Sequence, residues 1–250
     1  MSLLSVQREG SGSSFVWLHG FTQTRASAHQ FRSILAGDHE LWTLDLPGHG
    51  AAGSLRASLD ETADLVADVL PVQPVALGGY SFGARVALHV ALRHPGHVSA
   101  LVLLGASRGI ENLDERRERV ARDEALARHI EEVGVEAFLD EWLAQPMFAS
   151  VPDDPLERAS RATNTARGLA DSLRLAGTGT QAWLAPLLGV VDAPTLALAG
   201  AHDAKFTAEA RAIALGVQAG SWGLVADAGH AAHLEQPGPT AARVVEFLDG

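Results

Sequence analysis

The pentapeptide at residues 79–83 (GYSFG) lies between an apolar run and a helical pattern, and it constrains the fold more than any other segment. Residues 74–77 have the apolar character of a buried parallel strand. After the pentapeptide, apolar residues recur at three- and four-residue spacing. Strand, G-x-S-x-G turn and helix together form a nucleophile elbow, in which small residues let the backbone turn sharply and expose the serine Oγ. Ser81 is therefore the candidate reactive residue.

Strands and helices alternate on both sides of this elbow. The predicted strands are residues 3–6, 13–18, 41–44, 74–77, 98–104, 195–199 and 222–226, and the predicted helices outside the elbow are residues 28–35, 58–70, 208–215 and 240–248. Parallel strands that are buried on both faces have nearly continuous apolar sequences, as several of these runs do. The sequence therefore predicts an α/β fold with a doubly wound, mostly parallel sheet.

The alternation stops between residues 107 and 186, where no run has the character of a strand. Helical spacing is found instead at residues 113–132, 135–144 and 155–175, the last holding one or two helices. Helices inserted into an alternating pattern indicate a lid over the carboxyl edge of the sheet. We expect residues 1–106 and 187–250 to form the core and residues 107–186 to form an all-helical lid.

Composition excludes several classes of protein. A chain of 250 residues that is 47% hydrophobic and 20% charged suits one globular domain, with or without an inserted subdomain. The absence of cysteine rules out disulfides, a thiol nucleophile and thiolate metal sites. The net charge of −11 argues against nucleic-acid binding. No G-x-G-x-x-G or P-loop sequence is present, so we expect no cofactor.

Cellular location is also constrained by the sequence. The polar residues 7–9 come too early for the apolar region of a signal peptide, and no apolar run approaches the length of a membrane span. We therefore expect a cytoplasmic protein that does not span a membrane. No sequence feature points to an obligate protein partner.

Two later positions can complete a serine-centred site. A serine hydroxyl becomes a useful nucleophile or base when an imidazole accepts its proton and a carboxylate orients that imidazole. In this topology the acid and the histidine follow the serine in chain order, at the ends of later strands. Asp203 follows the strand at 195–199, and His230 follows the strand at 222–226. Ser81, Asp203 and His230 are therefore the predicted triad.

Simpler explanations exist for these residues. Ser81 could be an ordinary turn serine, and Asp203 could only cap the helix that follows it. Asp192 and Asp227 are alternative acids. His233 could form a metal pair with the candidate histidine, but no third ligand is in view, so a packing or hydrogen-bonding role is the preferred interpretation and no metal is expected.

Backbone and cationic groups complete the candidate site. The N–H groups of Phe82, after the serine, and Phe21, in a His-Gly-Phe turn after a strand, are the predicted oxyanion hole. Arg85 lies four residues after Ser81 on the same face of the predicted helix, and Lys205 lies two residues after the candidate acid. Cations that converge on a serine site predict a small-molecule substrate with several carboxylates.

Five segments carry a resemblance to a known family. They are residues 46–50 (LPGHG), 79–85 (GYSFGAR), 142–150 (WLAQPMFAS), 203–206 (DAKF) and 229–233 (GHAAH). The chain resembles the α/β-hydrolase superfamily throughout. More narrowly, it is similar to the 2-succinyl-6-hydroxy-2,4-cyclohexadiene-1-carboxylate synthases, lyases that eliminate pyruvate in menaquinone biosynthesis. The first segment is common to the superfamily, whereas the serine-to-arginine spacing, Gln-Pro-x-Phe and Asp-x-Lys-Phe are more specific.

The resemblance implies further site residues and a mechanism. It places cations for substrate carboxylates at Arg85, Arg119, Arg161 and Lys205, with Tyr80 and Trp142 lining the site. It also implies that Ser81 acts as a general base, removing a proton α to the succinyl carbonyl. Pyruvate would then be expelled without an acyl-enzyme.

Two other functions fit the same residues. A carboxylic-ester hydrolase would use Ser81 as a covalent nucleophile on an anionic ester, and the triad alone does not separate a base from a nucleophile. A non-catalytic ligand receptor on the same fold is the second alternative, against which the intact triad argues. The cations favour the lyase over the hydrolase.

Overall fold

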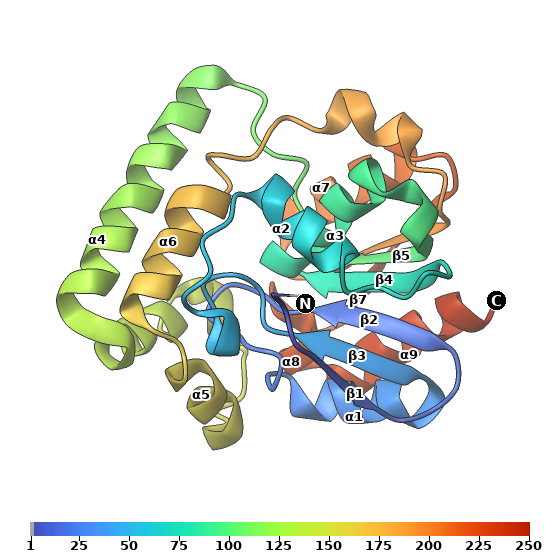
Figure 1. The fold of residues 1–250 in the computed structure, drawn as a ribbon, viewed down its shortest axis with the longest axis horizontal. Coiled ribbons are helices and arrows are strands. Elements are labelled where there is room, and N and C mark those ends of the chain that lie inside the picture. Colours follow the sequence, from blue (N-terminus) through green and yellow to red (C-terminus); the bar gives the residue numbers. More distant parts are fainter. Residues whose placement is uncertain (1–2) are drawn as a thin grey trace.

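The computed structural model describes residues 3–250, which form a seven-stranded sheet covered by helices (Figure 1). The strands are β1 (Val6–Glu9), β2 (Ser14–Leu18), β3 (Glu40–Leu44), β4 (Val75–Tyr80), β5 (Val98–Leu104), β6 (Thr195–Gly200) and β7 (Gly220–Val225). Their order in the sheet is β1-β3-β2-β4-β5-β6-β7, and every pairing is parallel except that of β1 with β3. The predicted doubly wound, mostly parallel sheet is confirmed.

Helices cover both faces of this sheet (Figure 1). One face carries α1 (His29–Asp38), α8 (Ala232–Glu235) and α9 (Pro237–Asp249), and the other carries α2 (Leu59–Ala67), α3 (Phe82–Arg93) and α7 (Ala204–Gly216). Successive residues of β2 point to opposite faces, so Phe15 and Trp17 enter one hydrophobic core while Val16 and Leu18 enter the other. Burial on both faces explains why this strand has a continuous apolar sequence.

The segment between β5 and β6 is helical. It contains α4 (Leu113–Leu143), α5 (Pro155–Ala162) and α6 (Ala166–Ala176), together with the short 3₁₀ turns η3 (Pro146–Phe148) and η4 (Ala185–Val190). The other 3₁₀ turns are η1 (Gly50–Ala52) and η2 (Pro95–His97). The helix α4 is interrupted at Gly134, whose φ of 80° separates the two helices that the sequence predicts there. Ile130 and Phe138 of α4 pack against Leu169 and Leu173 of α6 in a small core of their own.

The first edge strand differs from its prediction. Residues 3–6 were expected to form it because they are more apolar than residues 7–9, but β1 begins at Val6 and ends at Glu9. As an edge strand it is only half-buried, so its sequence is mostly polar and its two charged side chains make contacts along the edge. Glu9 pairs with Arg32 at 2.7 Å, and the Arg8 guanidinium lies 3.8 Å from the Trp42 ring centroid.

A helix that crosses a bilayer must be both long and apolar. Over residues 3–250, each helix is either too short or too polar to span a membrane.

Candidate active site

Ser81 lies at a tight turn between β4 and α3. Its backbone has φ 50° and ψ −104°, a conformation that non-glycine residues rarely adopt. A Cβ atom added at Gly79 would lie 2.4 Å from the carbonyl carbon of Gly83, and one added at Gly83 would lie 2.2 Å from the oxygen of Leu18. The turn therefore requires glycine on both sides of Ser81, because backbone atoms fill the space of any side chain.

We expect Gly83→Ala to destabilise the protein. The new methyl group would meet the backbone of β2, which cannot rotate away as a flexible side chain could, so α3 must shift outward. The melting temperature should fall by about 4–10 °C in differential scanning fluorimetry. Gly96→Ala is the matched control, since nothing lies within 4 Å of a Cβ atom at that exposed position. Equal melting temperatures for the two variants would contradict the steric argument.

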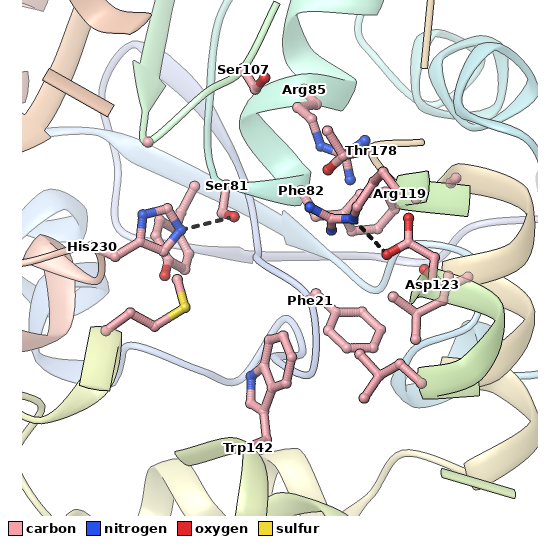
Figure 2. A pocket seen from close by; sticks show the side chains of 18 of the residues that line it. Phe21, Ser81, Phe82, Arg85, Ser107, Arg119, Asp123, Trp142, Thr178 and His230 are labelled. Carbon is pink, nitrogen blue, oxygen red and sulfur yellow. Dashed lines mark hydrogen bonds and ion pairs between the residues drawn. The ribbon is translucent and has the colours of Figure 1, made fainter. Parts of the chain in front are cut away.

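Ser81, His230 and Asp203 form a continuous hydrogen-bonded line. His230 Nε2 lies 3.2 Å from Ser81 Oγ, and His230 Nδ1 lies 2.9 Å from Asp203 Oδ2 (Figure 2 shows the first contact). Asp203 Oδ1 accepts the Phe206 N–H at 3.1 Å, so this aspartate also caps α7. The two explanations of Asp203 are therefore compatible, because each uses a different oxygen.

The charge of Asp203 is stabilised in this position. Burial alone would raise the pKa of the carboxyl group, but hydrogen bonds from His230 and the Phe206 N–H outweigh it and leave the pKa below its usual value. The alternative acids Asp192 and Asp227 are exposed, and the carboxylate bonded to His230 among residues 3–250 is that of Asp203. His233 is buried and accepts a hydrogen bond from Gln23 at 3.0 Å, in keeping with the packing role preferred for it.

Two peptide planes carry the N–H groups that are predicted to form the oxyanion hole. The Gly20 carbonyl accepts hydrogen bonds from His19 Nδ1 at 2.9 Å and from the Gln23 N–H at 3.1 Å. Since a peptide is planar and trans, fixing this carbonyl fixes the Phe21 N–H in the opposite direction. The Phe82 N–H belongs to the first turn of α3, where backbone N–H groups have no acceptor within the helix. The Phe21 peptide is thus fixed by hydrogen bonds and the Phe82 N–H has no acceptor within its helix, and the oxyanion hole stays a prediction.

His19 stays neutral, which keeps this arrangement fixed. Burial lowers its pKa to about 4. The Leu46 N–H donates to His19 Nε2 at 3.0 Å, so the proton of the neutral ring is on Nδ1 and is donated to Gly20. The buried ring of His49 contacts the rings of both Phe21 and Phe82. Its centroid lies 5.8 Å from the centroid of the Phe21 ring and 5.6 Å from that of the Phe82 ring.

A cavity of about 410 Å³ opens above Ser81 and His230 (Figure 2). Phe21, Phe82, Tyr80 and Trp142 contribute aromatic surface to it, and four cations line it: Arg85, Arg119, Arg122 and Lys205. The Trp142 ring meets that of Phe21 edge-on at 5.4 Å, and the Tyr80 ring lies 5.3 Å from that of His230. Three of the four cations that the sequence predicted, Arg85, Arg119 and Lys205, therefore line this cavity.

Arg85 is a buried cation without a matching anion. Only 8% of its surface is exposed, and it donates one hydrogen bond, at 3.3 Å, to the neutral Gln181. The carboxylate that lines the same cavity, Asp123, forms its ion pair with Arg119. Burial lowers the pKa of its guanidinium to about 10, the nearby Arg119 lowers it further, and the Asp123 carboxylate partly opposes both effects. A charge kept in this environment is suited to an anionic ligand.

Helix α4 supplies more of the cavity wall than the sequence predicted. Arg119, Arg122, Asp123 and Leu126 share one helical face and line the cavity. Asp123 accepts a hydrogen bond from Arg119 Nε at 2.7 Å (Figure 2). The i,i+4 spacing of this pair was a usable signal for Asp123, and Gln145 begins the Gln-Pro-x-Phe segment of the family resemblance. Thr178, which also lines the cavity, has no such signal.

Arg161 is placed differently from the expectation. It is only 2% exposed, and of the residues that the structure describes it is not among those lining the cavity. Its Nη2 forms an ion pair with Glu157 Oε1 at 2.9 Å, and its Nη1 donates to the hydroxyl of Thr22. Its partners are therefore protein groups on the loop after β2 and on its own helix.

The described residues contain no metal centre of the usual kind. No group of three or more His, Asp or Glu side chains within residues 3–250 is placed to hold a metal ion. The chemistry of the site as it stands is that of a serine, an imidazole and cationic side chains.

Comparison with known proteins gives one consistent family. A profile described as "Alpha/beta hydrolase family" matches residues 15–243. A Bacillus subtilis (strain 168) protein, provisionally named 2-succinyl-6-hydroxy-2,4-cyclohexadiene-1-carboxylate synthase, is 36% identical, covering 98% of this chain and 94% of its own. The synthase of that name from Yersinia pseudotuberculosis serotype O:1b (strain IP 31758) is 33% identical, covering 98% of this chain and 90% of its own.

A solved structure agrees with this result. The structure of MenH from S. aureus matches with a TM-score of 0.90 and 29% identity, covering 100% of this chain and 98% of that one. The structural match, the matches to the two sequence relatives and the match to the family profile each cover nearly the whole chain. The chain belongs to the α/β-hydrolase family and, within it, to the family of 2-succinyl-6-hydroxy-2,4-cyclohexadiene-1-carboxylate synthases.

Proposed function

We propose that this protein is a lyase that eliminates pyruvate from 2-succinyl-5-enolpyruvyl-6-hydroxy-3-cyclohexene-1-carboxylate, a step of menaquinone biosynthesis. The observation that carries the proposal is the unpaired, buried Arg85 beside the line of Ser81, His230 and Asp203. A plain esterase needs no such charge, whereas this substrate has three carboxylates to hold. The names of the two sequence relatives point to the same reaction.

In the proposed mechanism Ser81 acts as the base. His230 accepts the hydroxyl proton through Nε2, and Asp203 holds the ring and stabilises the imidazolium. Ser81 Oγ then removes a proton α to the succinyl carbonyl. The electrons pass through the ring and break the C–O bond to the enolpyruvyl group, which takes up a proton and leaves as pyruvate. The N–H groups of Phe21 and Phe82 stabilise the negative charge that develops on the carbonyl oxygen.

The remaining cavity residues hold the substrate in this proposal. Arg85, Arg119 and Lys205 bind carboxylates, while Tyr80 and Trp142 form walls against the ring. We further propose that residues 107–186 act as a lid on a core of residues 1–106 and 187–250, because α4 contributes one wall of the cavity. A small polycarboxylate is the only partner that this reaction requires, and we expect the reaction to take place in the cytoplasm.

Pyruvate release tests the proposal. The enolpyruvyl substrate would be generated in place by the preceding enzyme, and lactate dehydrogenase would report pyruvate, beside a p-nitrophenyl ester assay of the same preparation. We expect pyruvate release that depends on enzyme concentration, with ester cleavage at least about 10²-fold slower. A burst of p-nitrophenol without pyruvate would overturn the lyase and favour hydrolysis of an anionic ester on the same triad.

A further inference from the structure

Four polar side chains on one face of α5 and of the turn after it (residues 155–164, the α5 segment) are buried against the loop that carries Phe21. They lie at i, i+3, i+4 and i+7 and are at most 9% exposed: Glu157, Ser160, Arg161 and Asn164. The loop opposite contributes Thr22, Gln23, Thr24 and Ser27, each at most 4% exposed. Polar groups are seldom buried in such numbers without specific partners, so we expect this contact to depend on specific hydrogen bonds.

Two of these side chains hold Thr22. Arg161 Nη1 donates to its hydroxyl, and Asn164 Nδ2 donates to its carbonyl oxygen at 2.7 Å. Thr22 has a φ of 67°, in the left-handed region that a β-branched residue avoids. A residue keeps such a conformation only where its surroundings impose it. Because Thr22 directly follows Phe21, these two bonds determine the direction of the chain as it leaves the oxyanion hole.

Gln23 holds the other side of the same turn. Its Oε1 accepts the Gly20 N–H at 2.9 Å, and its Nε2 donates to Glu157 Oε1 at 3.2 Å. The second oxygen of Glu157 accepts the Ala28 N–H at 2.8 Å. The residues on both sides of Phe21 are therefore bonded to α5, directly through Thr22 and indirectly through Gln23.

We propose that the α5 segment positions the Phe21 half of the oxyanion hole, and that Arg161 acts as a positioning residue through Thr22. This assignment deepens the proposed function and rests on it only for the identity of the oxygen that the hole stabilises. In this assignment Arg161 does not bind a substrate carboxylate, because Nη1 and Nη2 both bond protein groups and Glu157 balances its charge. Within residues 3–250 its Nε has no protein partner, but it is buried and Arg161 does not line the cavity. Displacement of α5 would release Thr22 and misdirect the Phe21 N–H.

Thr22→Val is the most direct test. Valine keeps the shape of threonine and removes the hydroxyl that Arg161 bonds, while the arginine and its charge remain. Thr22→Ser restores the hydroxyl. Asn164→Ala removes the second bond to Thr22 by a change at a different residue. Arg158→Ala is the matched control on the same helix, where the guanidinium pairs at the surface with Asp140 at 2.8 Å.

Two readouts separate positioning from substrate binding. The first is kcat and KM for pyruvate release. The second is the rate at which diisopropyl fluorophosphate modifies Ser81, followed by intact mass: Ser81 Oγ bonds to phosphorus, fluoride leaves, and the proton passes to His230. This reagent is neutral, so its reaction uses the oxyanion hole and needs no cation for a carboxylate.

We expect Thr22→Val and Asn164→Ala to lower kcat by about 10- to 100-fold, with KM changed less than about threefold. The inactivation rate should fall by a similar factor, and Thr22→Ser should recover most of both. Circular dichroism melts would show that the variants remain folded. Arg158→Ala should behave as the unmodified protein in both assays.

The proposal is overturned if Thr22→Val leaves both readouts unchanged while Arg161→Gln raises KM and spares the inactivation rate. That result would mean that Arg161 binds a carboxylate after all. If the unmodified protein released no pyruvate, the proposed lyase would fail, but the inactivation rates would still report whether α5 positions the hole. The two proposals therefore fail separately.

Discussion

Ser81→Ala should lower kcat for pyruvate release by about 10⁴-fold while KM changes less than about threefold. The hydroxyl is the group that removes the proton, and it is bonded to His230 Nε2 at 3.2 Å. Substrate carboxylates are held by other residues, so binding should survive its loss. The measurement is the lactate-dehydrogenase-coupled assay under saturating and subsaturating substrate.

The triad should also behave as a unit. In the Ser81→Ala protein, the further substitution His230→Gln should lower kcat by less than about threefold, because the imidazole acts through the serine. Ser99→Ala, at an exposed position of β5, is the control and should leave turnover unchanged. Independent, multiplicative losses from the serine and the histidine would contradict the proposed chain of proton transfer.

The mechanism can be distinguished from covalent catalysis in the same experiments. Rapid quenching of the unmodified protein during turnover should show no mass increase on Ser81, since a base forms no bond to carbon. Accumulation of an acyl adduct would instead make Ser81 a nucleophile and support the hydrolase alternative.

The positions of the triad could be predicted because they depend on strand order and chain direction. β4 and β6 are buried strands with apolar sequences, and β7 is the more exposed edge strand beside β6. The carboxyl ends of parallel strands meet at one edge of a sheet. Ser81, Asp203 and His230 each follow one of these ends. The need for glycine at two positions of the elbow could also be predicted from the sequence, because it follows from the tight turn itself.

The lid side chains could not be placed in the same way. Helical spacing shows that Arg119 and Arg122 share a face of α4, but the sequence does not say which face meets the cavity. Arg116, on the same helix, bonds the carbonyl of Ile110 instead, and Arg117 pairs with Asp114 in solvent. Tertiary packing of α4 against α6 makes this choice.

Arg161 illustrates the same limit within α5. In the sequence it is one arginine among several on predicted lid helices, and the family resemblance suggested a substrate contact. The structure buries it with Glu157, four residues earlier, and with a loop about 139 residues away in the chain. A long-range pairing of this kind leaves no periodic signal in a single sequence.

Arg85→Met should lower kcat/KM for pyruvate release by about 10²- to 10³-fold, with both a higher KM and a lower kcat. A buried charge that meets a carboxylate is worth several kcal/mol when one partner is removed, and the same contact orients the substrate over Ser81. Arg93→Met is the matched control on α3, where the guanidinium lies at the surface and pairs with Asp64 at 2.7 Å. An unchanged kcat/KM in Arg85→Met would remove this residue from the site.

The same substitution should make the free protein more stable. Burial lowers the pKa of Arg85 to about 10, so below that pH the folded state carries a cost for the charged form, of the order of 3 kcal/mol at neutral pH. Methionine fills similar volume without this cost but loses the hydrogen bond to Gln181, which offsets about half of the gain. The melting temperature should therefore rise by about 3–6 °C. The difference should narrow as the pH rises through 10, where the unmodified protein can lose the proton. Arg93→Met, which removes a surface ion pair, should change the melting temperature by less than about 2 °C. A lower melting temperature for Arg85→Met would mean that protein groups already stabilise the charge of this guanidinium. The argument that it needs a substrate carboxylate would then fail.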